Sequence, residues 1–155
     1  MGRGQFFLVA AIIIIGIAIT IGTIYNSASS PNSDSKILYL TEEIKYEAVQ
    51  LINSGTYNSL DPAKINENIV ALTNIYSRSN PNVQILIIYG EQEILYKYLK
   101  NSIEDNTKAT ITMDGKKIIA SINNGQIHEF SINKGYNFHV ALKKETEGET
   151  YVASA

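Results

Sequence analysis

The two histidines have the clearest capacity for chemistry in this sequence. His128 is predicted to share a strand face with Phe130 and Ile132, and His139 to share one with Asn137 and Lys143. The sequence leaves open whether the two faces are the same. A two-histidine metal site would require both imidazoles to converge with a carboxylate such as Glu129. Nothing in the sequence has the spacing of metal ligands, so we expect no metal site here.

Two groups of glutamates offer carboxylates, the ligands that hard cations prefer. The first group falls on the solvated face of a predicted helix and the second in a polar turn, which are simpler explanations. The sequence also lacks a Gly-rich phosphate loop, a nucleophile elbow and a Ser/His/Asp order. We therefore predict no enzymatic activity and no cofactor. The groups are Glu42, Glu43 and Glu47, and Glu145, Glu147 and Glu149.

The composition excludes further classes of function and site. The 155 residues carry a net charge of −2, with no cysteine and no tryptophan. Scattered, nearly balanced charges argue against nucleic-acid binding, and the lack of cysteine excludes disulfides and thiolate metal sites. The ten tyrosines could line a ligand-binding face, but most fall in predicted strands and helix stripes, where tyrosines usually pack.

The run from Phe6 to Ile24 contains no charged residue and no proline. A helix needs about 20 apolar residues to cross ~30 Å of hydrocarbon, so we predict a transmembrane helix at residues 6–25, with the lipid bilayer as its partner. Residues 1–5 precede it, and Arg3 is their only basic side chain. Because basic residues are retained in the cytoplasm, we predict a single-pass cell-membrane protein with a cytoplasmic N-terminus and an extracytoplasmic C-terminal domain.

A cleavable secretory signal is the alternative interpretation of this run, because the small residues Ser27-Ala28-Ser29 follow it. The apolar core of such a signal usually spans about 7 to 15 residues. The run from Phe6 to Ile24 is longer, which favours a retained anchor.

The residues Arg3-Gly4-Gln5-Phe6-Phe7 resemble archaeal class III signal peptides, the leaders of type IV pilin-like proteins. The resemblance covers about the first ten residues and implies processing between Gly4 and Gln5. Two features depart from this resemblance. Many pilins carry a glutamate at the fifth position after the cut, where this chain has Val9. Pilins also continue the apolar segment as one long helix, whereas residues 26–35 have the composition of a flexible linker. The rest of the chain is similar in arrangement to archaeal proteins that pair such an N-terminus with a small outer domain, which implies no activity.

Three small residues, Ala11, Ala18 and Gly22, share one face of the predicted membrane helix. Small residues allow another helix to approach closely, so self-association or a protein partner within the membrane is one interpretation. Their spacing is not a strict small-xxx-small repeat, and we favour the interpretation in which nothing pairs there.

Residues 36–155 are predicted to form one domain that begins with two helices. Asp34-Ser35 and Gly55 are expected to cap the first helix. The second is expected to start at Asp61-Pro62 and to stop at Asn80-Pro81. The apolar stripes are Ile37, Leu40, Ile44, Ala48, Leu51 and Ile52, then Ile65, Ile69, Leu72, Ile75 and Tyr76.

After the second helix the pattern becomes that of strands. Val83–Tyr89 is almost entirely apolar, which is typical of a strand covered on both faces. Ile94–Leu99 fits either a helix or a strand, and we favour a strand because Gly90–Glu93 reads as a hairpin loop. Further turns are expected at Asp114-Gly115, Asn124-Gly125 and Asn133-Lys134-Gly135, the last leading to a strand at 136–143.

These elements predict an α+β fold in which an N-terminal transmembrane helix is followed by two helices packed on an antiparallel β-meander sheet. The features together favour a membrane-anchored protein that displays a small extracytoplasmic binding or interaction domain. The alternative is an archaeal type IV pilin-like subunit of a surface filament, processed after Gly4.

Overall fold

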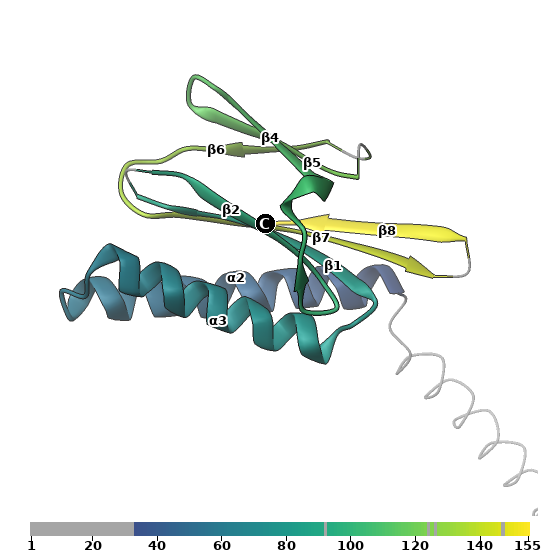
Figure 1. Ribbon diagram of the computed structural model, residues 1–155, viewed down its shortest axis with the longest axis horizontal. Coiled ribbons are helices and arrows are strands. Elements are labelled where there is room, and N and C mark those ends of the chain that lie inside the picture. The colour runs from purple at the N-terminus through teal and green to yellow at the C-terminus, as the bar shows by residue number, and fades with distance from the viewer. Residues whose placement is uncertain (1–32, 92, 124, 126, 147) are drawn as a thin grey trace, which may run out of the picture. The chain divides into compact units, whose positions relative to one another are not determined.

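The computed structural model describes residues 33–155 except 92, 124, 126 and 147. Within these residues two α-helices are followed by eight β-strands (Figure 1). The predicted membrane segment 6–25 lies outside the described residues. No helix in the described part of the chain has the length and apolar character needed to cross a bilayer.

Helix α2 (Ser33–Tyr57) is longer than predicted at both ends. Its described part starts at Ser33, so Asp34 and Ser35 lie within the helix, and the last residues of the predicted linker are helical. It also continues past Gly55, where a Cβ atom would lie only 2.8 Å from Cγ1 of Ile65. Gly55 therefore allows the second helix to approach closely instead of ending the first.

Helix α3 (Pro62–Ser79) starts as predicted, because the Asp61 side chain accepts a hydrogen bond from the backbone N–H of Ala63 at 2.8 Å. The predicted stripe is wrong at Ile75, which is 62% exposed. Thr73 and Ser77 take the buried positions instead. Their hydroxyls are satisfied there: Thr73 Oγ1 donates to the Ile69 carbonyl at 2.8 Å, and Ser77 Oγ accepts from the Ser102 backbone at 2.8 Å.

The larger sheet is antiparallel, with the strand order β3-β2-β1-β7-β8. Its central strand β1 is buried along its whole length, as its apolar sequence predicted. The strand prediction for the ambiguous segment is also confirmed, because β2 pairs with β1 in the register Tyr89↔Leu95. The bounds are β1 Val83–Gly90, β2 Leu95–Lys100, β3 Ile103–Glu104, β7 Asn137–Thr146 and β8 Glu149–Ser154.

The smaller sheet has the order β4-β5-β6, and a 3₁₀ turn, η1 (Asn106–Lys108), leads into it. The prediction of one meander is therefore wrong: β7 leaves β6 and pairs with β1 in the other sheet. The polar turn expected around Glu149 is also only partly right, because β8 begins there. The bounds are β4 Ala109–Asp114, β5 Lys117–Ile122 and β6 Ile127–Ser131.

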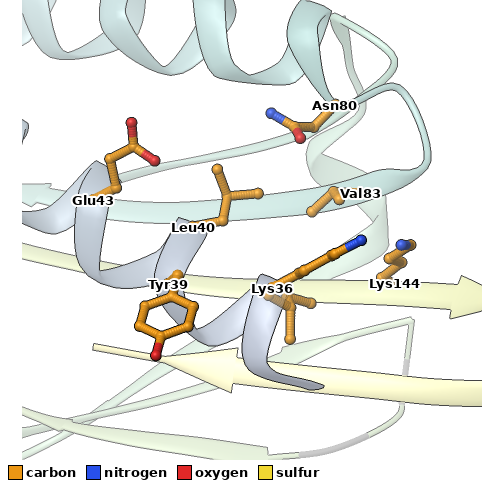
Figure 2. A pocket seen from close by; sticks show the side chains of 8 residues that line it. Lys36, Tyr39, Leu40, Glu43, Asn80, Val83 and Lys144 are labelled. Carbon is orange, nitrogen blue, oxygen red and sulfur yellow. The ribbon is translucent and has the colours of Figure 1, made fainter. Parts of the chain in front are cut away.

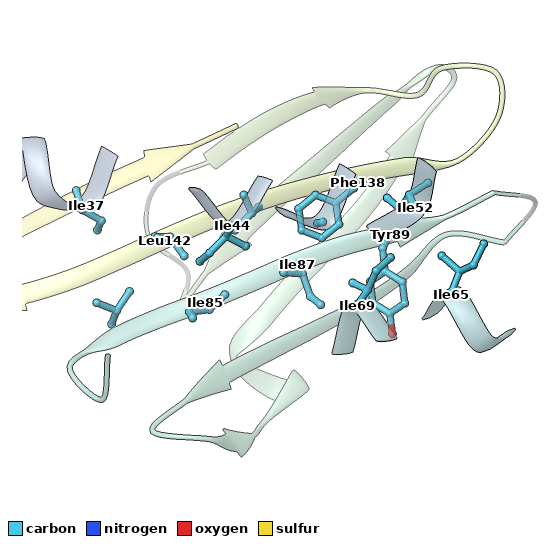
Figure 3. Packing of buried hydrophobic residues seen from close by; sticks show 13 residues of the cluster. Ile37, Ile44, Ile52, Ile65, Ile69, Ile85, Ile87, Tyr89, Phe138 and Leu142 are labelled. Atoms are coloured by element: carbon cyan, nitrogen blue, oxygen red, sulfur yellow. The ribbon is translucent and has the colours of Figure 1, made fainter. Parts of the chain in front are cut away.

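Two apolar layers result, one on each face of the larger sheet. The helices cover one face, where side chains from α2 and α3 meet those of β1 and β7 (Figure 3). The smaller sheet covers the other face (Figure 1). Ile85 and Ile87 of β1 face the helices, whereas Leu86 and Ile88 face the smaller sheet. The strand thus contributes to both layers through its alternating side chains.

We predict that Ile87→Ala destabilises the fold by about 2 to 5 kcal/mol, since it removes fully buried methylenes from the helix–sheet layer. The matched control is Ile75→Ala, the same substitution at an exposed position, which should change the free energy of unfolding by less than about 0.5 kcal/mol. Urea unfolding followed by circular dichroism measures both. Equal effects at the two positions would contradict the burial of β1.

Candidate functional site

Several sequence-predicted sites fall on residues that the structure does not describe. The processing site at Gly4 and Gln5, and the small residues Ala11, Ala18 and Gly22, all belong to residues 1–32. They remain predictions.

The two histidines lie on strands of different sheets and both turn into the layer between the sheets. The ring of Phe130 stacks with His128 at a centroid distance of 6.2 Å and with His139 at 4.8 Å. Glu129 points to the opposite face of β6, where its carboxylate accepts from Lys117 Nζ at 3.2 Å and both side chains are exposed. The imidazoles are thus linked through a phenyl ring without that carboxylate, and the described residues contain no group of three metal-binding side chains.

Burial controls the charge of both histidines. It lowers the pKa of His128 and of His139, because an imidazolium loses hydration between the sheets. The Ser131 backbone hydrogen-bonds the His139 ring and partly opposes this shift, while the positive charge of Lys45 adds to it. Nε2 of His139 is buried and has no hydrogen-bond partner in the described structure. A proton added there would remain without compensation.

A cavity of about 330 Å³ opens beside this stack, where the end of the smaller sheet faces β7 and β8. Lys143 in its wall is mostly buried and donates to Glu145 at 2.8 Å, and this contact lowers the pKa of the Glu145 carboxyl. The cavity offers a neutral imidazole and an ammonium group that is already engaged. It could hold a small polar group, but no described contact activates a hydroxyl there as a nucleophile. The lining is Ile122, Gly125, His128, Lys143, Thr150 and Val152.

A polar network, buried at Gln84 and Tyr98 and exposed at Asn123, joins the two sheets at the same end. Oε1 of Gln84, on β1, accepts from the Tyr98 hydroxyl at 3.0 Å and from Nδ2 of Asn123 at 2.9 Å. Burial raises the pKa of Tyr98, and the Asn123 contact opposes this. Sequence reasoning missed this network. Its signal was the one amide within the apolar run Val83–Tyr89, since a buried amide requires partners.

The first glutamate group lies on the exposed surface of α2, as predicted. Two of its members, Glu47 and Glu43, also lie near the Tyr76 hydroxyl of α3. Burial raises the pKa of that hydroxyl most, and these two contacts raise it further. Of the second group, Glu145 and Glu149 lie in the β7–β8 hairpin, and Glu147 is not described.

Some of the described tyrosines are buried and others are exposed to solvent. Tyr89 and Tyr98 are buried, as predicted for strand positions. On α2, in contrast, Tyr39, Tyr46 and Tyr57 are 70%, 66% and 89% exposed. Helical spacing places these three on the outward side of α2, away from the sheet. These three tyrosines lie outside the predicted apolar stripe of the helix, so the expectation of packing did not apply to them.

A second cavity of about 330 Å³ lies where the N-terminal end of α2 meets the end of α3 and the starting residue of β1 (Figure 2). We call it the α2 pocket. Its walls are partly apolar and partly polar, and the ammonium groups of Lys36 and Lys144 extend to the same side of it (Figure 2). Sequence reasoning could not find it, because four separate elements build it. The lining is Lys36, Ile37, Tyr39, Leu40, Glu43, Asn80, Val83 and Lys144.

Comparison with known proteins found no matching family model, no matching curated protein and no matching solved structure.

We predict that stability falls as the pH drops below about 6.5, the ordinary imidazole pKa. The pKa of each histidine is lower in the folded state, so the unfolded chain binds more protons in this range and acid favours it. Thermal unfolding between pH 8 and pH 5 measures the slope of stability against pH. The double variant His128→Phe/His139→Gln removes every histidine of the chain and should flatten it. An unchanged slope in that variant would assign the effect to other groups.

Proposed function

We propose that this chain is a single-pass membrane protein that displays its folded domain outside the cytoplasm as a binding module. The observation that carries the proposal is the uncharged run from Phe6 to Ile24, which is long enough to cross a bilayer. Arg3 precedes it and no further basic residue occurs until Lys36, which favours a cytoplasmic N-terminus.

The domain supports this proposal because its core does not require the apolar run. Residues 33–155 form a compact unit, and both faces of its larger sheet are covered by elements of that unit. Such a domain can fold beside a membrane and remain available to partners.

The outward side of α2 supports a role in binding rather than in catalysis. Tyrosine is enriched in protein interfaces because its ring supplies contact area and its hydroxyl a hydrogen bond. Tyr39, Tyr46 and Tyr57 are all exposed on this helix. The net charge of −2 gives no support for a nucleic-acid partner.

The topology can be tested with single thiols, because the chain contains no cysteine. We expect a membrane-impermeant maleimide to label Tyr57→Cys in intact cells, since this position is 89% exposed in the domain. Gly2→Cys, in the predicted cytoplasmic segment, should be labelled only after lysis. Labelling of Gly2→Cys but not of Tyr57→Cys in intact cells would reverse the proposed orientation.

A second candidate function, a pilin-like filament subunit, is favoured by the N-terminal part of α2. The chain is already helical at Ser33, within the segment predicted to be a linker, and the buried side of this helix packs on an antiparallel sheet. Only residues 25–32 separate it from the apolar run. A filament subunit would need the run and the domain to be held in a fixed relation, and a short connection favours this.

Inserting about six Gly/Ser residues between residues 30 and 31 separates the two candidates. For a tethered module, we expect anchoring and folding to persist, because the reach of a flexible linker grows only with the square root of its length. Electron microscopy should then show no filaments from either protein, and mass analysis should show no form that begins at Gln5. Parent filaments that vanish on insertion, together with cleavage after Gly4, would establish the filament subunit instead.

A further inference from the structure

Strand β8 forms an open edge of the larger sheet. It is the last strand in the order β3-β2-β1-β7-β8, and among the described strands only β7 pairs with it. The opposite edge is β3, which has two residues and is too short to offer much to a neighbouring chain. β8 has six residues and contains neither proline nor lysine, which commonly protect an edge strand.

The backbone groups that β8 directs outward follow from its register. Val140 and Ala155 exchange two backbone hydrogen bonds of 3.0 Å, so they are a hydrogen-bonded pair of the β7–β8 ladder. Such pairs alternate along antiparallel strands, which places the next ones at Ala153 and Tyr151. The intervening residues direct their N–H and C=O groups away from β7, toward the open edge. These residues are Thr150, Val152 and Ser154.

The outward groups can pair with the same groups of a second copy. If Val152 stands opposite its own copy in an antiparallel arrangement, Thr150 stands opposite Ser154 of that copy, and symmetry supplies the reverse pair. Each of these pairs exchanges two hydrogen bonds, so the three pairs would form roughly six. β8 is thus complementary to itself, as an interface about a two-fold axis requires.

Both faces of β8 would gain contacts from this pairing. Tyr151 and Ala153 pack in the layer between the sheet and the helices, whereas Thr150 and Val152 line the cavity between the two sheets. An added strand would extend both layers, with Val152 beside its copy on one face and Tyr151 beside Ala153 of the copy on the other. A hydrophobic gain on two faces would therefore accompany the backbone hydrogen bonds.

The edges of the smaller sheet, β4 and β6, offer less. Each of these strands has one face exposed to solvent, as Thr112 on β4 and Glu129 on β6 show. A strand added at either edge would bury apolar side chains on one face only. β8 is therefore the edge that a second copy fits best.

Helix α2 supplies a second surface beside β8. It packs on β7 and β8, whereas α3 packs on β1 and β2. The two helices thus lie two strand spacings apart, about 10 Å, a distance at which helices pack, and they do contact each other. Pairing of β8 with its copy would place two α2 helices at the same spacing across the axis. The joined sheet would repeat a helix–helix spacing that the domain already contains.

The side of α2 that would meet the copy is partly apolar. Glu47 lies near the Tyr76 hydroxyl of α3. Leu38 precedes Glu47 by about two and a half helical turns, so it lies on the side away from α3. Val49 follows Leu38 by about three turns and lies on the same side. These two side chains are 50% and 37% exposed, and a second α2 would cover them.

Leu38 also lies level with the middle of β8. The preceding residue, Ile37, lines the α2 pocket together with Lys144, which is in the middle of the β7–β8 pairing. The two-fold axis would therefore bring Leu38 toward its own copy. The charged residues on this side, Glu42 and Lys45, would be displaced from their copies along the helix by about 12 and 21 Å, so like charges stay apart.

We propose that the domain pairs with a second copy of itself through β8. The two larger sheets join across a two-fold axis at Val152, and the two α2 helices meet at Leu38. The cavities that Thr150 and Val152 line then adjoin each other across the axis. This inference goes beyond the proposed binding module and does not depend on the membrane anchor.

The test uses single cysteines in the full-length chain, which contains none of its own, in mild detergent. Opposed residues of a hydrogen-bonded antiparallel pair have Cα atoms about 5.5 Å apart, which a disulfide can span. We expect Val152→Cys to form a disulfide-linked dimer on oxidation, and Thr150→Cys to cross-link with Ser154→Cys when the two proteins are mixed. Thr150→Cys alone should cross-link at least about tenfold more slowly, because the axis separates its two copies by about 13 Å. Tyr57→Cys, which is 89% exposed, measures random collision on the same non-reducing gel.

Two lysine variants test the surfaces separately. Val152→Lys sets two ammonium groups opposite each other at the axis and should slow the cross-linking of Thr150→Cys with Ser154→Cys at least about tenfold. Leu38→Lys changes an exposed position on α2, leaves β8 intact and should slow it at least about threefold. The matched control is Ile75→Lys, the same kind of change at an exposed position on α3, which should have no effect. Circular dichroism verifies that each variant is folded.

Three results would overturn the pairing. The first is cross-linking of Thr150→Cys alone as fast as that of the mixed pair, since the proposed register forbids it. The second is cross-linking that survives both Val152→Lys and Leu38→Lys. The third is the absence of any dimer above the level of Tyr57→Cys, and if hydrogen exchange nevertheless protects the outward N–H of Val152, a different extended segment occupies the edge.

Discussion

The structure depends on one strand that needs to be covered on both faces. Every residue of β1 is buried, and its alternating side chains supply two apolar surfaces. Exposure of either surface to water would cost roughly 25 cal/mol of folding free energy for each Å² of apolar area. A layer on one side alone would therefore leave the other apolar surface of the strand in water. The helix pair and the smaller sheet are the two covers, and their positions follow from this requirement.

The sequence predicted the elements whose signals are local. The Asp61-Pro62 start of α3, the continuous burial of β1 and the strand at β2 are all confirmed. Gly115 lies in the predicted β4–β5 turn with φ +60°, a conformation that glycine adopts without strain, although the paired residues Asp114 and Lys117 place this two-residue turn one residue later than expected. Each of these features depends on residues a few positions apart.

The wrong predictions concern choices between distant partners. Nothing near β7 specifies whether it continues beside β6 or crosses to β1, because its alternation of side chains suits either position. The buried side of α3 was misjudged at Ile75, because Ser77 becomes a suitable core residue only once its hydroxyl accepts from the backbone of Ser102, 25 residues away. The α2 pocket has the same character: Lys36 and Lys144 are brought together by the pairing of β7 with β1, which no local pattern encodes.

The Gln84 amide has a consequence for the uniqueness of the fold. Apolar layers tolerate sliding, because one isoleucine surface packs on another in several alignments with similar energy. The bond between the Gln84 oxygen and Asn123 does not, because a slide of one sheet over the other would part these two groups. Tyr98 donates to the same oxygen from the neighbouring strand of the larger sheet, so the acceptor stays in place. This directional contact, worth about 0.5 to 1.5 kcal/mol, favours the native alignment over others that apolar packing alone leaves close in energy.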